Sequence, residues 1–254
     1  YSWGTGLGTN YIALIAYYLA SPLNLLFVFV PSEFLREFVT LSLLIKVGCA
    51  GSFFAILMRF LFKRNDFSIV FFSALYALCA FTMGYYWNII WFDTFALLPL
   101  LVLGTVALVT RGKYKLFVIA LALSMLTNYY IGFFSCIFVV IVFIGICLFM
   151  KTPIKVFFKK LLQIAGFALL GVGISALLIL PAYIALQHTF KSLNAAIPEI
   201  TTLYSANYTD ALTYATDILA GFNAFTKPTD KDGLPNISCG FICVLLAAFF
   251  FRSR

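Results

Sequence analysis

Long apolar stretches, separated by short polar connections, dominate this chain. They lie at 38–62, 67–84, 92–110, 115–128, 130–150, 161–183 and 238–251. An α-helix needs about 20 apolar residues to cross the hydrocarbon core of a bilayer. Most of the stretches have that length, and those at 115–128 and 238–251 are short. The pattern therefore predicts an all-α polytopic transmembrane protein.

Two places in this pattern need a break. The run 116–150 is too long for a single span, and Asn128, Tyr129 and Tyr130 with Gly132 favour a tight turn inside it. The run 11–30 is apolar but contains Pro22, which interrupts a helix. We expect two short helices there, broken at Pro22 and lying along the outer membrane interface.

These expectations divide the chain into four parts. Residues 1–37 form an extracytoplasmic loop with interfacial helices, and 38–183 form a transmembrane bundle of about six spans. Residues 184–237 form a polar extracytoplasmic segment with a helix near 208–220, and 238–254 hold a further, truncated span. Since the chain begins with Tyr1 and stops just after an apolar run, we interpret it as part of a longer protein.

Composition excludes a soluble fold. The chain is 63% hydrophobic and 10% charged, with a mean hydropathy of +1.05, whereas a soluble domain carries about 25% charged residues. The formal charge of +8 follows from the excess of lysine and arginine in cytoplasmic loops of membrane proteins, so it does not indicate a nucleic-acid partner. The six cysteines show no metal-ligand spacing, and we predict no metal site from them.

The basic residues choose the orientation. Those that follow the first, third, fifth and last spans are Lys63, Arg64, Arg111, Lys113, Lys115, Lys151, Lys155, Lys159, Lys160, Arg252 and Arg254, against the single acid Asp66. Cytoplasmic loops carry such an excess. The turns at 85–93 and 128–130 and the segment 184–237 then face outward, in a multi-pass protein of the cell membrane whose active face is extracytoplasmic.

Two charged residues in the apolar runs are the main candidates for function. Lys46 lies within the first span, where a lysine needs a carboxylate, a phosphate or a water-filled cavity. It could bind an anionic group or form a structural ion pair with a residue such as Asp93. Asp93 opens the third span, where a carboxylate stabilises the N-terminus of a helix. It could also line an outer cavity, where it would act as a base, bind the acceptor or pair with Lys46. Arg59, near the inner end of the first span, is explained by snorkelling.

Further candidates gather on the predicted outer side. They are Trp3, Trp87, Asn88, Trp91, Asn128, Tyr129, Tyr130, His188 and Asn236. Aromatic side chains at this level are commonly membrane-belt residues, but they also stack against sugars. His188 is the single histidine and could be an acid, a base or a solvated loop residue. We expect the set to contain residues that bind a sugar or an acceptor. A site on this side has no access to cytoplasmic nucleotide sugars, so its donor must come from outside or from the lipid.

Six phrases, in order along the chain, resemble the YfhO family of bacterial membrane proteins. They occupy residues 2–10, 17–24, 44–48, 86–93, 128–132 and 233–240. That family is similar to the GT-C glycosyltransferases, which are helical, polytopic and active on the extracytoplasmic side. The resemblance implies a GT-C-like bundle that transfers sugar from a polyprenyl-phosphate carrier to a cell-envelope acceptor such as a teichoic-acid-type polymer.

The resemblance also implies roles for residues. Lys46 would neutralise the donor phosphate, and Asp93 would orient the acceptor or hold Lys46. GT-C enzymes use an acidic residue of the first outer loop as base or ligand of a possible divalent metal, and here that residue would lie upstream of Tyr1. The rival interpretation is a transporter or flippase for a lipid-linked sugar, which an intramembrane lysine and broken helices would suit equally.

Overall fold

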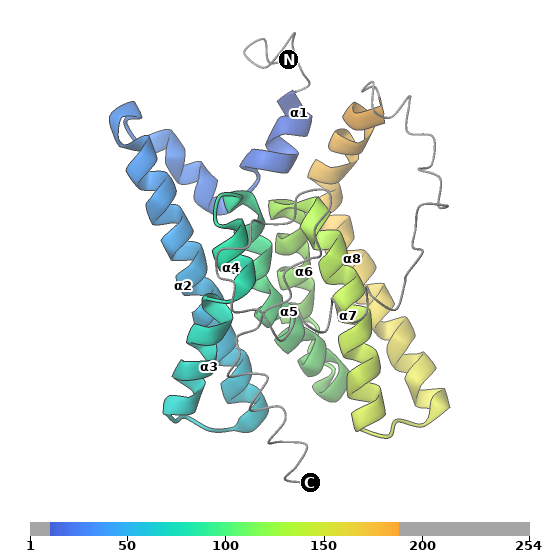
Figure 1. Ribbon diagram of the computed structural model, residues 1–254. Helices are drawn as coiled ribbons and strands as arrows, with labels where there is room; N and C mark the ends of the chain where they lie inside the picture. The colour runs from blue at the N-terminus through green and yellow to red at the C-terminus, as the bar shows by residue number, and fades with distance from the viewer. Residues whose placement is uncertain (1–10, 188–254) are drawn as a thin grey trace, which may run out of the picture.

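The computed structural model of the protein describes residues 11–187, and these form an α-helical bundle (Figure 1). The predicted all-α polytopic fold is confirmed: no strand occurs within this range, and five of its helical segments are long and apolar enough to cross a membrane. The expected segment at 184–237 beyond Gln187, with its helix near 208–220, and the expected span at 238–251 lie outside the described residues.

The N-terminal part consists of short helical pieces. They are α1 (Tyr11–Leu14), the π-helix η1 (Ile15–Leu19) and the 3-10 helices η2 (Pro22–Phe29) and η3 (Ser32–Phe34). The chain breaks before Pro22, where the sequence predicts it. Figure 1 shows the chain after α1 descending toward the bundle and rising again before α2. Ala20 and Ser21 connect η1 to η2. We call residues 11–34 the hairpin, and its tip is buried because Ser21 is only 2% exposed.

The first long helix, α2 (Leu35–Phe62), is followed by α3 (Phe67–Ala77) and α4 (Ala80–Tyr85). The sequence predicts one span at 67–84, but the helix is interrupted at Leu78 and Cys79. Thr82 makes the interruption tolerable, because its hydroxyl donates to the freed carbonyl of Ala77 at 2.7 Å. A stack of three rings, Phe54 on Tyr76 at 4.6 Å and Tyr76 on Phe95 at 4.7 Å, joins α2, α3 and α5.

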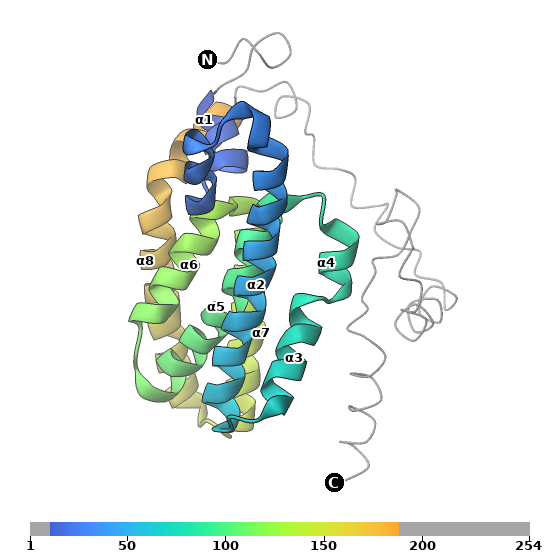
Figure 2. The same ribbon diagram turned by 90° about the vertical axis from the view of Figure 1, so that its left-hand side faces the viewer.

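The centre of the bundle is α5 (Phe92–Arg111), which follows the short turn η4 (Ile89–Trp91). In the apolar 18-residue stretch of the span that contains α5, 67% of the residues are buried, against 17–28% in the other four candidate spans. In Figure 2, α3 and α4 stand on one side of α2, and α6 and α8 stand on the other. The apolar core follows the inner faces of α5 to α8; its members are Leu101, Leu108, Val109, Phe117, Val118, Ala120, Leu121, Val139, Phe143, Cys147 and Ile164.

The remaining helices are α6 (Lys115–Thr127), α7 (Tyr129–Phe149) and α8 (Ile154–Gln187). Only Asn128 separates α6 from α7, at the predicted turn. The helix α8 extends beyond the predicted span at 161–183 at both ends: it begins at Ile154, includes Lys155, Lys159 and Lys160, and ends at Gln187. Lysine is a good helix former, and Lys155 and Lys159 are exposed, so the helix continues past the apolar run.

The outer faces of the bundle suit a lipid solvent. Large apolar side chains such as Phe149 on α7 and Leu162 and Leu177 on α8 are 73–88% exposed, together with Leu148 and Leu169 beside them. One end of the bundle carries the loops 63–66, 112–114 and 150–153 with their lysines and arginines, and we call it the basic end. The hairpin, η4 and the α6–α7 junction lie at the opposite end (Figure 1).

Gly104 allows α5 and α6 to pack closely. A methyl group at this position would lie 2.6 Å from the backbone nitrogen of Phe117 and 2.7 Å from its Cα. Gly104→Ala is therefore expected to destabilise the fold by about 1–3 kcal/mol, since backbone atoms must move. Unfolding of the purified protein in increasing SDS measures this effect. Gly48→Ala on α2, where nothing lies within 4 Å, is the control; an equal loss in both variants would contradict the close approach.

Candidate functional site

A buried ion pair joins α2 to α5 near the end opposite the basic end. Lys46 is 1% exposed and Asp93 is 8% exposed, and 2.6 Å separates Nζ of Lys46 from Oδ2 of Asp93. Asp93 lies in the first turn of α5, where the helix dipole also favours its negative charge. Among residues 11–187, this is the ion pair that the structure shows.

Two further hydrogen bonds complete the surroundings of the pair. Nζ of Lys46 also donates to the carbonyl oxygen of Ile89 at 3.1 Å. Oγ of Ser21 donates to Oδ1 of Asp93 at 2.7 Å. A buried charge pair is tolerated only when its remaining polar atoms also find partners. Three separate elements, the hairpin, α2 and the η4–α5 junction, therefore meet at Asp93.

Local hydrogen bonds at the tip of the hairpin hold Ser21 in contact with Asp93. Ser21 has an extended backbone (φ −67°, ψ 133°), as expected for a residue before proline. The backbone N–H of Asn24 donates to the carbonyl of Ser21 at 2.9 Å, and Nδ2 of Asn24 donates to the carbonyl of Tyr18 at 2.8 Å. These bonds close the tip locally, so Ser21 is held with its hydroxyl against Asp93.

A small cavity lies beside the ion pair. Its volume is about 140 Å³. It is lined by Pro22, Leu23, Lys46, Cys49, Phe53, Asp93, Ala96, Leu97, Leu123 and Thr127. Pockets that hold small-molecule ligands usually measure about 300–1,000 Å³, so this cavity does not hold a sugar together with a phosphate as it stands. Two of its lining residues belong to the hairpin tip, which therefore limits its size.

Next to the cavity, hydroxyl groups connect α5 with α6. Oγ1 of Thr94 donates to the carbonyl of Ser124 at 3.4 Å and lies 3.5 Å from Oγ1 of Thr127. Thr127 in turn donates to the carbonyl of Leu123 at 2.9 Å. Thr94 and Thr127 are buried, so the polar surroundings of Asp93 extend to the end of α6.

Asn128 is fully buried at the α6–α7 junction, with 0% exposure. Its Oδ1 accepts from the backbone N–H of Ile131 at 3.0 Å and so caps the N-terminus of α7. Its Nδ2 has no hydrogen-bond partner among the described residues. A buried amide donor without a partner is costly.

The other aromatic and amide candidates are dispersed. Trp87 and Tyr130 are 61% and 49% exposed, as belt residues would be. The ring of Trp91 lies 5.6 Å from that of Tyr85, and its enclosed Nε1 has no partner in the described range. Tyr129 meets Tyr17 of the hairpin at 6.0 Å, and Asn88 is half-buried in the turn before η4. Their predicted binding roles stay predictions.

Three candidates, Trp3, His188 and Asn236, lie outside the described residues. Within residues 11–187, no group of three or more His, Cys, Asp or Glu side chains is placed to hold a metal ion.

Sequence reasoning missed Ser21, Thr94 and Thr127. Their signal was weak, because serine and threonine inside a span commonly bond to the preceding helical turn. Thr127 does so, but Ser21 instead bonds to a residue 72 positions away. The position of Ser21 directly before Pro22, where the helix had to break, was the available hint.

Comparison with known proteins identifies a family. The family model described as "Bacterial membrane protein YfhO" matches residues 1–254. No curated protein and no solved structure matches the chain. Of the six resembling phrases, those at 17–24, 44–48 and 86–93 contain Ser21, Lys46 and Asp93, which the fold brings together. The match over the whole chain and the five membrane-length helices confirm the resemblance: the chain is a multi-pass membrane protein that belongs to the YfhO family.

Proposed function

We propose that this chain is an integral membrane glycosyltransferase of the GT-C type. It transfers a sugar from a polyprenyl-phosphate carrier to an extracytoplasmic cell-envelope acceptor such as a teichoic-acid-type polymer. The observation that supports this proposal best is the buried Lys46–Asp93 pair, placed under a hairpin at the end opposite the basic end. Membership of the YfhO family agrees with it.

The distribution of charge supports the orientation in this proposal. The loops at the basic end contain lysines and arginines with Asp66 as their one carboxylate in the described range. Cytoplasmic loops carry such an excess, so the ion pair belongs to the extracytoplasmic half of the bundle. A donor available in that leaflet is a sugar attached to a lipid phosphate, and the apolar sides of the helices offer a place for its lipid tail.

The transfer needs charge stabilisation at the leaving group. The bond between the anomeric carbon of the sugar and the phosphate oxygen breaks, and the oxygen keeps the electron pair. The acceptor hydroxyl forms the new bond to the anomeric carbon and gives up its proton to a base. A cation at the phosphate stabilises the charge that develops there, and Lys46 is the buried cation of the described residues.

Asp93 and the donor phosphate compete for Lys46 in this proposal. Without donor, Asp93 neutralises the ammonium group of Lys46. A donor phosphate that takes over this role leaves Asp93 free to orient the acceptor hydroxyl or to accept its proton. The exchange keeps Lys46 paired at each stage, as a buried cation requires.

The hairpin must move for a donor to reach Lys46, because the cavity of about 140 Å³ is smaller than a sugar phosphate needs. Its contact to the ion pair is the Ser21 hydroxyl. A hydrogen bond to a charged group contributes about 1.5–3 kcal/mol, so this bond favours the closed arrangement.

Ser21→Ala is therefore expected to lower KM for the donor, by about 10- to 100-fold given that hydrogen-bond energy, while kcat stays within about twofold. Initial rates at varied donor concentration measure both constants. Ser52→Ala on α2, where the exposed hydroxyl bonds to the carbonyl of Gly48, is the matched control. A fall in kcat by tenfold or more in Ser21→Ala would contradict a purely gating role.

Transport of a lipid-linked sugar is the second candidate function. The observation that favours it is the interruption between α3 and α4 at Leu78 and Cys79, since transporters use broken helices. The test uses membranes loaded with polyprenyl phosphate that carries a labelled sugar. Label that moves into envelope polymer supports the transferase. Label that changes leaflet but stays on the lipid rejects the transferase and supports transport.

A further inference from the structure

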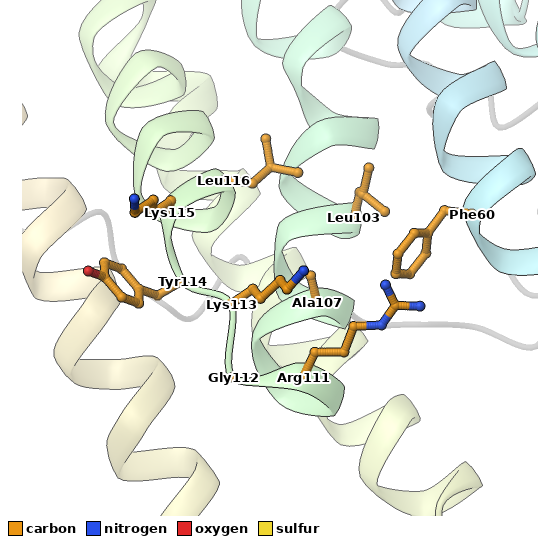
Figure 3. Close-up of a pocket in the computed structure, with 9 residues that line it drawn as sticks. All are labelled: Phe60, Leu103, Ala107, Arg111, Gly112, Lys113, Tyr114, Lys115 and Leu116. Atoms are coloured by element: carbon orange, nitrogen blue, oxygen red, sulfur yellow. The ribbon is translucent and has the colours of Figure 1, made fainter.

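A second and larger cavity lies at the basic end, far from the ion pair along the bundle. Its volume is about 550 Å³. It is formed by the end of α2, the C-terminal part of α5 and the loop that leads into α6 (Figure 3). The lining residues are Phe60, Leu103, Ala107, Arg111, Gly112, Lys113, Tyr114, Lys115 and Leu116.

The cavity has an apolar wall. Phe60 of α2 faces Leu103 and Ala107 of α5, which are one helical turn apart. Leu116 of α6 lies on the other side of Leu103 from Phe60 (Figure 3). Leu103 and Ala107 are buried, and Phe60 and Leu116 are half-buried. A wall of this composition suits a hydrocarbon chain.

The rim of the cavity is cationic. Arg111, Lys113 and Lys115 all line it. Figure 3 shows Arg111 and Lys113 reaching across the space below Leu103 and Leu116, whereas the side chain of Lys115 points away from them. The guanidinium carbon of Arg111 lies 4.5 Å from the centroid of the Phe60 ring, so the charge is held against the apolar wall. In the part of the chain that the structure describes, none of the three cations forms an ion pair with a carboxylate.

The loop that carries these cations has a fixed shape. Gly112 adopts a left-handed conformation (φ 70°) and ends α5. The N–H groups of Gly112 and Lys113 donate to the carbonyls of Leu108 and Ala107, at 2.9 Å and 3.2 Å. On the other side, the Tyr114 ring stacks on Phe167 of α8 with centroids 4.5 Å apart. The cations therefore extend from a turn that is anchored at both ends.

We propose that this cavity binds an anionic phospholipid of the leaflet at the basic end. The phosphate lies between Arg111 and Lys113, and one acyl chain lies against Phe60, Leu103, Ala107 and Leu116. The apolar wall and the cationic rim together favour this occupant. A soluble anion would leave the apolar wall without a partner. A zwitterionic lipid carries no net negative charge to balance the cations of the rim. Basic pockets between membrane helices on the cytoplasmic side recognise such head groups, and the guanidinium of Arg111 suits a phosphate.

The test uses the purified full chain in a neutral detergent, with added phosphatidylglycerol or phosphatidylcholine, and native mass spectrometry to count bound lipid. Arg111→Gln/Lys113→Gln is expected to weaken phosphatidylglycerol binding by about fivefold for each charge removed. Both side chains are exposed, so folding is retained. Lys155→Gln/Lys159→Gln, which removes two exposed charges of α8 at the same end, is the control and is expected to bind phosphatidylglycerol as wild type does.

Three results would overturn the proposal. The first is equal phosphatidylglycerol binding by wild type and Arg111→Gln/Lys113→Gln. The second is equal binding of phosphatidylcholine and phosphatidylglycerol by wild type. The third is displacement of phosphatidylglycerol by glycerol 1-phosphate at similar concentration, which would identify a soluble phosphate as the occupant. Sugar transfer is not a readout here, so a failure of this proposal leaves the proposed function untouched.

Discussion

Replacing Asp93 by asparagine is expected to destabilise the folded protein by about 3–5 kcal/mol, because it leaves the ammonium group of Lys46 buried without a counter-ion. Lys46 is 1% exposed and its next hydrogen-bond partner is the neutral carbonyl of Ile89. The measurement is unfolding of the purified protein in increasing SDS. Glu37→Gln, which removes an exposed carboxylate of α2, is the control and is expected to change stability by less than about 0.5 kcal/mol.

The double variant Lys46→Met/Asp93→Asn gives the sharper result. It removes both charges together, and replacing a buried ion pair with neutral groups is often close to neutral for stability. Most of the loss seen in Asp93→Asn is therefore expected to be recovered. If the double variant were as unstable as the sum of the two single variants, the two residues would not be energetically coupled.

Sugar transfer is expected to fall by about 10²–10³-fold when Lys46 is replaced by methionine, the size of effect that removal of one preorganised electrostatic group produces. The loss is expected in Lys46→Met/Asp93→Asn as well, although that variant keeps its fold. Activity and stability are thereby separated for the pair, because an ion pair needed only for folding would allow transfer to return in the double variant. Transfer of labelled sugar into envelope polymer measures the rate.

Arg59→Met is the matched control for this loss. Arg59 lies on the same helix and is exposed near the basic end, so transfer is expected to stay within a few-fold of wild type. Retained transfer in Lys46→Met/Asp93→Asn would reject Lys46 as the group that neutralises the leaving phosphate. The ion pair would then be a structural link between α2 and α5.

The helices were largely predictable from the sequence, because a bilayer demands long apolar runs and each run here has polar ends. The break between Leu78 and Cys79 was not predictable. No proline or glycine lies there, and the interruption depends on the Thr82 hydroxyl and on the ring stack that Tyr76 makes with Phe54 and Phe95. The start of α8 at Ile154 is not predicted from the apolar run, because the lysines at 155 and 159 are typical of a cytoplasmic loop.

The candidate site was predictable only in part. A lysine in an apolar run requires a partner, and Asp93 was one of the partners that the sequence allowed for Lys46. The contact of Ser21 with Asp93 depends on how the hairpin turns into the bundle, which no local pattern specifies. The unpartnered amide nitrogen of Asn128 is not predictable from the sequence either. The sequence predicts the turn, but it does not predict the burial that leaves Nδ2 without a partner among the described residues.

The junction at Asn128 has a consequence for how the protein enters the membrane during synthesis. At 1.5 Å per residue, the 13 residues of α6 span about 20 Å, less than the roughly 30 Å of a hydrocarbon core. The non-helical backbone at Asn128 then lies at membrane depth, which is tolerated because it is buried in protein. With one residue between them, α6 and α7 cannot be released into the lipid one after the other. They are expected to leave the insertion machinery together, as a preformed helical pair.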